Sequence, residues 1–166
     1  MSTALGIDPG ASTGIAVVHL GDDRVLRCSL AVAAHGKKWQ ATVTETLAYL
    51  QPGVAFIERP ADKVRAVGAR HHVAMFGLGR RFGRLEQLLL DRGHEVRPVT
   101  TSEWWAALPL RLTGKRGDGL HRVHEASSIV QGASAWLDGI TATHQPDAAE
   151  AILLAAAGCL LLGREK

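Results

Sequence analysis

The sequence lacks the features that mark several whole classes of protein. Its two cysteines, Cys28 and Cys159, lie far apart in apolar surroundings, which excludes a disulfide framework and indicates reduced core residues. The longest nearly apolar run, residues 148–162, carries Glu150 and is too short to span a bilayer, so we expect a buried helix and no membrane. The first residues show no secretory signal, and we therefore expect a cytoplasmic protein.

Internal repeats, heptads and long linkers are also absent. A chain of 166 residues has room for one domain, and we expect a single domain over residues 1–166. Hydrophobic residues make up 46% of the sequence and charged residues 21%, which are ordinary proportions for a globular protein. This composition excludes a disordered, collagenous or coiled-coil chain.

Arginine, in contrast, is abundant. The formal net charge is +3, and arginine outnumbers lysine nearly threefold, which suits bidentate contacts to phosphate. The basic residues gather in two clusters, over residues 59–97 and 115–124. A nucleic-acid partner and an ordinary solvated surface explain this pattern equally well, so charge alone leaves the choice open.

Hydrophobic patterning predicts an α/β fold. Strands are expected at residues 4–7, 14–20, 24–32, 54–57 and 95–99, and the first three form an antiparallel meander joined by short turns. Helices are expected at residues 39–50, 73–92, 103–108, 121–137 and 147–162, with Ser102 as the N-cap of the third. This order predicts a mixed five-stranded sheet with helices on both faces.

Four carboxylates occupy positions at which an α/β fold binds ligands. Asp8 ends the first strand, Glu58 ends the fourth, and Asp147 and Glu150 share one face at the start of the last helix. If the first and fourth strands are neighbours, all four meet at one edge of the sheet. Because clustered carboxylates repel one another, such a set favours a Mg²⁺ or Mn²⁺ site. Two such ions promote attack of water on a phosphodiester, so we predict metal-dependent phosphodiester hydrolysis.

Each of these residues also has a purely structural interpretation. Asp147 and Glu150 match a helix N-cap with a carboxylate at the third helical position. Asp8 fits an Asp-Pro-Gly turn, and Glu58 fits a surface ion pair. His144 is either a plain loop residue or a group that orients a water or meets a phosphate. The conjunction of the four acids favours the metal site over these separate explanations.

Three motifs resemble those of RuvC-type Holliday junction resolvases, which belong to the ribonuclease H-like superfamily. They are Gly6-Ile7-Asp8-Pro9-Gly10 with Thr13-Gly14, Ile57-Glu58-Arg59-Pro60, and His144-Gln145-Pro146-Asp147-Ala148-Ala149-Glu150-Ala151. Residues 78–83, 95–99 and 102–104 resemble the family's long helix, fifth strand and following segment. The resemblance covers essentially the whole chain, and its specificity lies in the combination of motifs.

The resemblance implies a ribonuclease H-like fold and a homodimeric endonuclease that nicks two strands of a four-way DNA junction in recombination and repair. Asp8, Glu58, Asp147 and Glu150 would be its catalytic residues and the ligands of two Mg²⁺ or Mn²⁺ ions. The dimer contact would lie on the long helix, here residues 80–89. Such an enzyme would act at the nucleoid, or in the host cytoplasm if a phage encodes it.

The basic clusters supply candidate contacts to the phosphates of branched DNA, and binding through them weakens steeply as salt is added. The candidate DNA contacts are Arg59, Lys63, Arg65, Arg70, Arg80, Arg81, Lys115, Arg116, His121, Arg122 and His144.

Three departures from the family pattern stand out. Glu150 occupies a position where the bacterial enzymes commonly have aspartate. The aromatic residue that often follows the second-motif glutamate is missing near Ala61, and Phe76 lies much further along. Leu120 falls near the place of the family's basic loop residue. The alternatives are a nuclease of the same fold for other branched DNA or RNA, a phosphate-binding module of the actin and sugar-kinase type, and a non-catalytic DNA-binding module.

Overall fold

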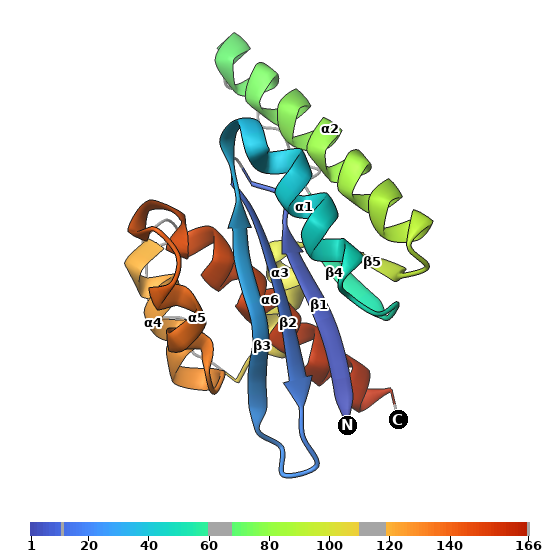
Figure 1. Cartoon of the computed structure of the whole chain (residues 1–166), viewed down its shortest axis with the longest axis vertical. Helices are drawn as coiled ribbons and strands as arrows, with labels where there is room; N and C mark the ends of the chain where they lie inside the picture. The colour runs from blue at the N-terminus through green and yellow to red at the C-terminus, as the bar shows by residue number, and fades with distance from the viewer. Residues whose placement is uncertain (11, 60–67, 110–118, 166) are drawn as a thin grey trace.

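The centre of the protein is a five-stranded mixed sheet in the order β3-β2-β1-β4-β5 (Figure 1). A computed structural model describes residues 1–10, 12–59, 68–109 and 119–165, with only the backbone described at 68–75 and 119. The strands are β1 (Ser2–Asp8), β2 (Thr13–Leu20), β3 (Leu26–Ala34), β4 (Val54–Glu58) and β5 (Glu95–Val99). The first three strands form the antiparallel meander, and β4 and β5 add to β1 in parallel. The sheet predicted from the sequence is confirmed.

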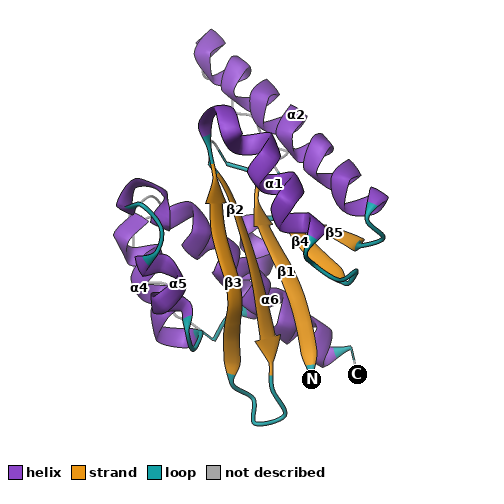
Figure 2. Cartoon of the chain, in the orientation of Figure 1, coloured by secondary structure: helices purple, strands orange, loops and turns teal. Residues whose placement is uncertain are grey.

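Helices cover both faces of this sheet (Figure 2). On one face lie α1 (Trp39–Ala48) and α2 (Gly68–Asp91), and on the other lies α6 (Gln145–Arg164). Packed around α6 are α3 (Thr101–Ala107), α4 (Gly119–Ile129) and α5 (Ala133–Asp138). Single turns of 3₁₀ helix, η1 (Gly36–Lys38) and η2 (Ala142–His144), precede α1 and α6.

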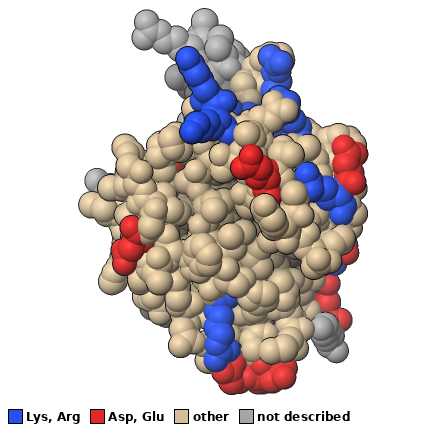
Figure 3. Space-filling model, in the orientation of Figure 1, with Lys and Arg blue, Asp and Glu red and all other residues tan. Residues whose placement is uncertain are grey.

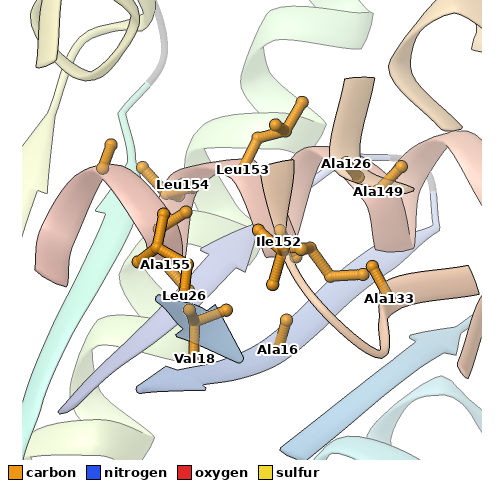
Figure 4. Packing of buried hydrophobic residues seen from close by; sticks show 14 of the residues in the cluster. Ala16, Val18, Leu26, Ala126, Ala133, Ala149, Ile152, Leu153, Leu154 and Ala155 are labelled. Atoms are coloured by element: carbon orange, nitrogen blue, oxygen red, sulfur yellow. The ribbon is translucent and has the colours of Figure 1, made fainter. Parts of the chain in front are cut away.

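Helix α6 forms the core of its side of the sheet. Every residue from Ala148 to Cys159 is buried except Glu150, and Ile152 faces the β2 residues Ala16 and Val18 (Figure 4). The stretch Ala142–Arg164 is long and apolar enough to cross a membrane, but 61% of its apolar window is buried inside the fold. The structure therefore uses it as the buried helix expected from the sequence.

Glycines let α6 lie unusually close to the sheet. A Cβ at Gly6 of β1 would collide with the backbone carbonyl oxygen of Ala151, and a Cβ at Gly158 would collide with the Phe56 ring. Alanines predominate on α6 for the same reason, because short side chains keep its axis near the strands. This close approach fixes where the first turns of α6 stand relative to the end of β1.

Residues 121–137 do not form the single helix that their pattern predicts. The chain instead forms α4 and α5, separated at Val130–Gly132. At the break, the N–H of Gln131 donates to the carbonyl oxygen of Leu26, and the N–H of Cys28 donates to that of Gln131. Gly132 takes a positive φ of 82°, which glycine adopts without strain. Pairing with β3 thus interrupts the helix.

The helices α2, α3, α4 and α6 also begin earlier than predicted, at Gly68, Thr101, Gly119 and Gln145. Thr100, and not Ser102, caps α3: its hydroxyl accepts the N–H of Glu103, whose carboxylate accepts the N–H of Thr100 in return. Helix α2 begins at Gly68, earlier than the predicted residue 73. Its first residues, Gly-Ala-Arg-His-His, carry no apolar stripe from which a helix could be predicted.

Candidate active site

Strands β1 and β4 end side by side, and each ends on a carboxylate. The two strands are parallel neighbours with Ile7 opposite Ile57, so Asp8 and Glu58 leave the sheet at the same edge. Both side chains are half-buried. The neighbouring strand ends on which the sequence-based prediction depends are therefore present.

Helix α6 brings a third carboxylate to this edge. Single carboxylate oxygens of Asp8, Glu58 and Glu150 all lie within 4.8 Å of one another. The first turn of α6 packs directly on the backbone of β2 at Gly14. A Cβ at that position would collide with the carbonyl oxygen of Asp147. The same glycine-based packing that forms the core thus delivers Glu150 to the strand ends.

Asp147 stands beside this group of three. A Cβ built on Gly10 would lie 3.5 Å from Asp8 Oδ2 and 3.6 Å from Asp147 Oδ1, so the two carboxylates flank the same glycine. The N–H of Gly10 donates to Asp8 Oδ1 at 3.2 Å. The structure therefore gathers all four predicted acids, with Asp8, Glu58 and Glu150 closest together and Asp147 at the side.

Helix capping does not account for the acids on α6. The helix begins at Gln145, its N-cap residue is His144, and no side chain caps it. Asp147 accordingly lies inside the first turn and Glu150 one turn further on, not at the cap and third positions that the capping interpretation requires. The capping alternative is wrong for this pair.

Crowding shifts the ionisation of these carboxyls. The pKa of Asp8 is raised well above its ordinary value, by burial first and then by the charges of Glu150, Glu58 and Asp147. Burial and the charge of Glu58 raise the pKa of Glu150, against the opposing effect of Arg122. Burial raises the pKa of Asp147 as well. The ionised cluster therefore destabilises the fold at neutral pH, and a cation bound between the acids would relieve that repulsion.

Hydrogen bonds from α3 orient Glu58. The hydroxyl of Thr101 donates to Glu58 Oε1, and the indole Nε1 of Trp104 donates to Oε2 at 3.1 Å. Trp104 is only 1% exposed, so its ring is fixed by packing. Sequence reasoning missed both residues; the available signal is their position directly after β5, the strand next to β4.

His144 and Ser12 support Asp147 from the other side. The Nδ1 atom of His144 lies 2.8 Å from the hydroxyl of Ser12 and 4.0 Å from Asp147 Oδ2. The imidazole stacks on that of His35, with ring centroids 3.8 Å apart. His144 therefore lies beside the acids, and a role toward a water or a phosphate stays a prediction.

Basic side chains approach the acids from α2. Arg81 donates to the carbonyl oxygen of Gly10 at 2.9 Å, next to Asp8. Arg80 is exposed, and the guanidinium of Arg84 lies 5.9 Å from the Trp39 ring centroid. Figure 3 shows Lys and Arg gathered at the end of the molecule where α1 begins and α2 passes. The acid cluster thus lies beside a positively charged surface.

One predicted DNA contact on α4 lies elsewhere than expected. Arg122 is only 5% exposed and pairs with Glu125 and Glu150, so it lies in the interior beside the acids and not on a DNA-facing surface. His121 is half-buried, with Nε2 3.0 Å from Glu125 Oε1, and its DNA contact stays a prediction. The sequence did not indicate the buried position of Arg122, because a basic residue within a basic segment is expected to face solvent.

The other predicted contacts are placed only in part. Arg59 directly follows β4 and is half-buried. Of Arg70 only the backbone, in α2, is described. The predictions that lie outside the described residues are those for Lys63, Arg65, Lys115 and Arg116.

The donor set suits a hard divalent cation. Asp8, Glu58 and Glu150 offer oxygen atoms that converge from three elements, which is the ligand type that Mg²⁺ and Mn²⁺ prefer. Burial and the neighbouring carboxylates raise the pKa of Asp8 and that of Glu150, so a bound cation would stabilise the ionised group. The residues present therefore fit the metal that the sequence predicts.

No protein-family model matches the chain, and no curated protein matches its sequence. Solved structures do match. RuvC of Thermus thermophilus, in complex with a Holliday junction substrate, superposes with a TM-score of 0.69 at 15% identity, covering 98% of this chain and 96% of that one. The chain has the RuvC fold.

Two further resolvases share this architecture. The fowlpox virus resolvase, in complex with Holliday junction DNA, gives a TM-score of 0.54 at 12% identity over 94% of this chain and 97% of that one. The yeast mitochondrial Holliday junction resolvase gives 0.57 at 12% identity over 97% and 79%. The RuvC-type, ribonuclease H-like fold expected from the motifs is thus confirmed over nearly the whole chain.

Replacing Asp8 by Asn should stabilise the metal-free protein. Because the pKa of Asp8 is raised in the folded state, its protonated form favours folding at low pH, and that contribution is lost as pH rises through the raised pKa. In EDTA at neutral pH, Asp8→Asn should melt a few degrees above wild type, and the difference should shrink on acidification. Mn²⁺ should raise the melting temperature of wild type and not of the variant.

The matched control is Asp138→Asn, a surface carboxylate at the end of α5, which should melt like wild type under all these conditions. Thermal unfolding monitored by circular dichroism measures both effects. An Asp8→Asn variant less stable than wild type in EDTA at neutral pH would contradict the repulsion inferred for the cluster.

Proposed function

We propose that this protein is a divalent-metal-dependent endonuclease that resolves four-way DNA junctions. The observation that carries the proposal is the convergence of Asp8, Glu58, Asp147 and Glu150 from β1, β4 and α6 at one edge of a RuvC fold. Clustered, half-buried carboxylates are costly in an isolated fold, as the raised pKa of Asp8 indicates, and they are expected where they serve chemistry. Two structural neighbours were solved with Holliday junction DNA, which supports the substrate class.

The four carboxylates would hold two Mg²⁺ or Mn²⁺ ions, with Asp8 central to the group. When bound, such ions supply a hydroxide-like nucleophile and charge stabilisation for a phosphodiester. The protein's own part is to keep the oxygens converged: α3 fixes Glu58 through Thr101 and Trp104, and the N–H of Gly10 holds Asp8. Before substrate binds, these hydrogen bonds already hold the carboxylates in the arrangement that hydrolysis requires.

The DNA strand would run along a groove beside α2. This groove has a volume of about 460 Å³ and is lined by Trp39, Gly77, Arg80, Arg81 and Arg84. Arg81 links it to the acid cluster through Gly10. Guanidinium groups bind phosphates in pairs of hydrogen bonds, so the groove suits the backbone next to the cleaved bond. Arg84 and Trp39 extend the set of contacts predicted from sequence.

Paired nicks in opposite strands require two such sites, and we assign the second to a homodimer formed through α2. The outward face of this helix carries Phe76 and Leu90, which are 69% and 51% exposed. Between them lie Gly79 and Gly83, and no described atom lies within 4 Å of a Cβ built on either. Figure 1 shows the first part of α2 extending past the sheet, free of other elements. A second α2 would bury this face at close range.

Cleavage of a labelled synthetic four-way junction tests the function. With Mg²⁺ or Mn²⁺ the protein should introduce paired nicks at the junction, and it should leave linear duplex intact. Asp8→Asn should cut at least about a thousandfold more slowly, because metal-ion catalysis contributes several kcal/mol of transition-state stabilisation. The variant should still bind the junction in EDTA, since the arginines of the groove remain.

In the same assay Asp138→Asn should cut at the wild-type rate. Cleavage of flaps or RNA in place of the junction would retain the metal site and refute the proposed substrate. Loss of junction binding by a folded Asp8→Asn protein would contradict the assignment of cleavage to the acids and of DNA binding to the arginines.

A bulky substitution in the proposed α2 interface tests the dimer. Wild type should sediment with a mass of about twice 17.7 kDa. Gly83→Leu should give a folded monomer, because leucine is a better helix former than glycine by roughly 1 kcal/mol yet blocks close approach of a partner helix. The matched change Gly77→Leu, on the groove side of α2, should leave the dimer intact. Monomeric wild type at micromolar concentration would contradict the proposal.

A further inference from the structure

Arg122 on α4 makes three contacts that together leave it little freedom. Its Nη1 atom lies 2.8 Å from Glu125 Oε2, and its Nε lies 3.3 Å from Glu150 Oε1. The guanidinium carbon stands 4.0 Å from the centroid of the Trp105 ring on α3. The residue is only 5% exposed. Two helices therefore hold this guanidinium against one oxygen of a predicted metal ligand.

Charge balance does not require the contact with Glu150. Burying an arginine is costly unless a partner neutralises it, and Glu125, itself 5% exposed, is that partner on the same helix. The Nε–H that points at Glu150 is an additional donor in the fixed fork of the guanidinium. Since Trp105 sets the plane of the fork, the direction of this donor is set by packing.

Glu150 needs such a restraint more than the shorter acids do. A glutamate side chain has one rotatable bond more than an aspartate, so ordering it costs more conformational entropy. In the part of the chain that the structure describes, Arg122 is the side chain that donates a hydrogen bond to Glu150. Glu58 is held by α3 and Asp8 by the N–H of Gly10. The bond from Arg122 occupies Oε1 and so limits the orientations open to the other oxygen.

We propose that Arg122 is a positioning residue for the metal centre: it holds Oε1 of Glu150 and thereby orders the carboxylate toward Asp8 and Glu58 before a divalent cation binds. The role in metal binding does not depend on which reaction the metal catalyses; only that reaction rests on the proposed function. This role predicts a specific defect in metal affinity when the guanidinium is lost, without a defect in DNA binding. It replaces the expectation, drawn from the basic segment, that Arg122 contacts DNA.

Mn²⁺ binding in the absence of DNA, followed by electron paramagnetic resonance, tests the proposal. Arg122→Lys keeps a cation beside Glu125 but loses the fixed fork, and it should raise the Mn²⁺ dissociation constant about 10- to 100-fold, as losses of outer-shell partners do. The double variant Arg122→Met with Glu125→Leu removes the buried pair as a unit, which is often neutral for folding, and it should show the same loss.

Two further measurements separate positioning from a structural role. If Arg122 acts through Glu150, Arg122→Lys should change the Mn²⁺ affinity of a Glu150→Gln protein by less than twofold. Arg97→Lys, in an ion pair with Glu95 and Glu165 away from the acids, should bind Mn²⁺ like wild type. Junction binding in EDTA should be unchanged in Arg122→Lys.

Unchanged Mn²⁺ affinity in both Arg122 variants would overturn the proposal. It would also be overturned if Arg122→Lys and Glu150→Gln weakened Mn²⁺ binding additively. Weaker junction binding by Arg122→Lys in EDTA would instead make Arg122 a DNA contact. Because Mn²⁺ binding is measured without DNA, failure of wild type to cut a four-way junction would refute the proposed function and leave this inference standing.

Discussion

Helix α6 can rest on the backbone of β1 and β2 only because Gly6 and Gly14 present no side chains to it. Both the hydrophobic core and the position of the acids depend on this contact. On one side it buries the alanine-rich face of α6 against the sheet. At the end of the sheet it sets Asp147 and Glu150 beside Asp8, so the position of the acids is fixed by the same packing that stabilises the fold.

The cost of that arrangement is repulsion. Four carboxylates share a partly buried edge, and the pKa of Asp8 is raised by burial and by its three acidic neighbours. The protein surrounds the group with directed donors: Thr101 and Trp104 hold Glu58, and Arg122 holds Glu150. The arginines of α2 stand further out, where Arg80, Arg81 and Arg84 line a groove. Destabilisation at the centre and positive charge at the rim support the proposed metal-dependent phosphodiesterase.

Much of this could be predicted from the sequence, for identifiable reasons. Apolar runs closed by Asp-Pro-Gly and Glu-Arg-Pro mark where β1 and β4 end, and the sheet edge follows once those strands are neighbours. The interior position of Arg122 could not be predicted, because it depends on Trp105 and Glu150 arriving from other helices. The break between α4 and α5 at Gly132 depends on pairing with β3. Such a contact cannot be predicted from helical periodicity.

Anomalous scattering from a crystal grown with Mn²⁺ tests the central claim most directly, since the claim is that these carboxylates form a metal centre. We expect a peak bound by oxygens of Asp8, Glu58 and Glu150, with Asp147 beside it, and its loss in Asp8→Asn. A Mn²⁺-containing crystal with no peak among these acids, or with their carboxylates turned away from an ion bound elsewhere, would contradict it.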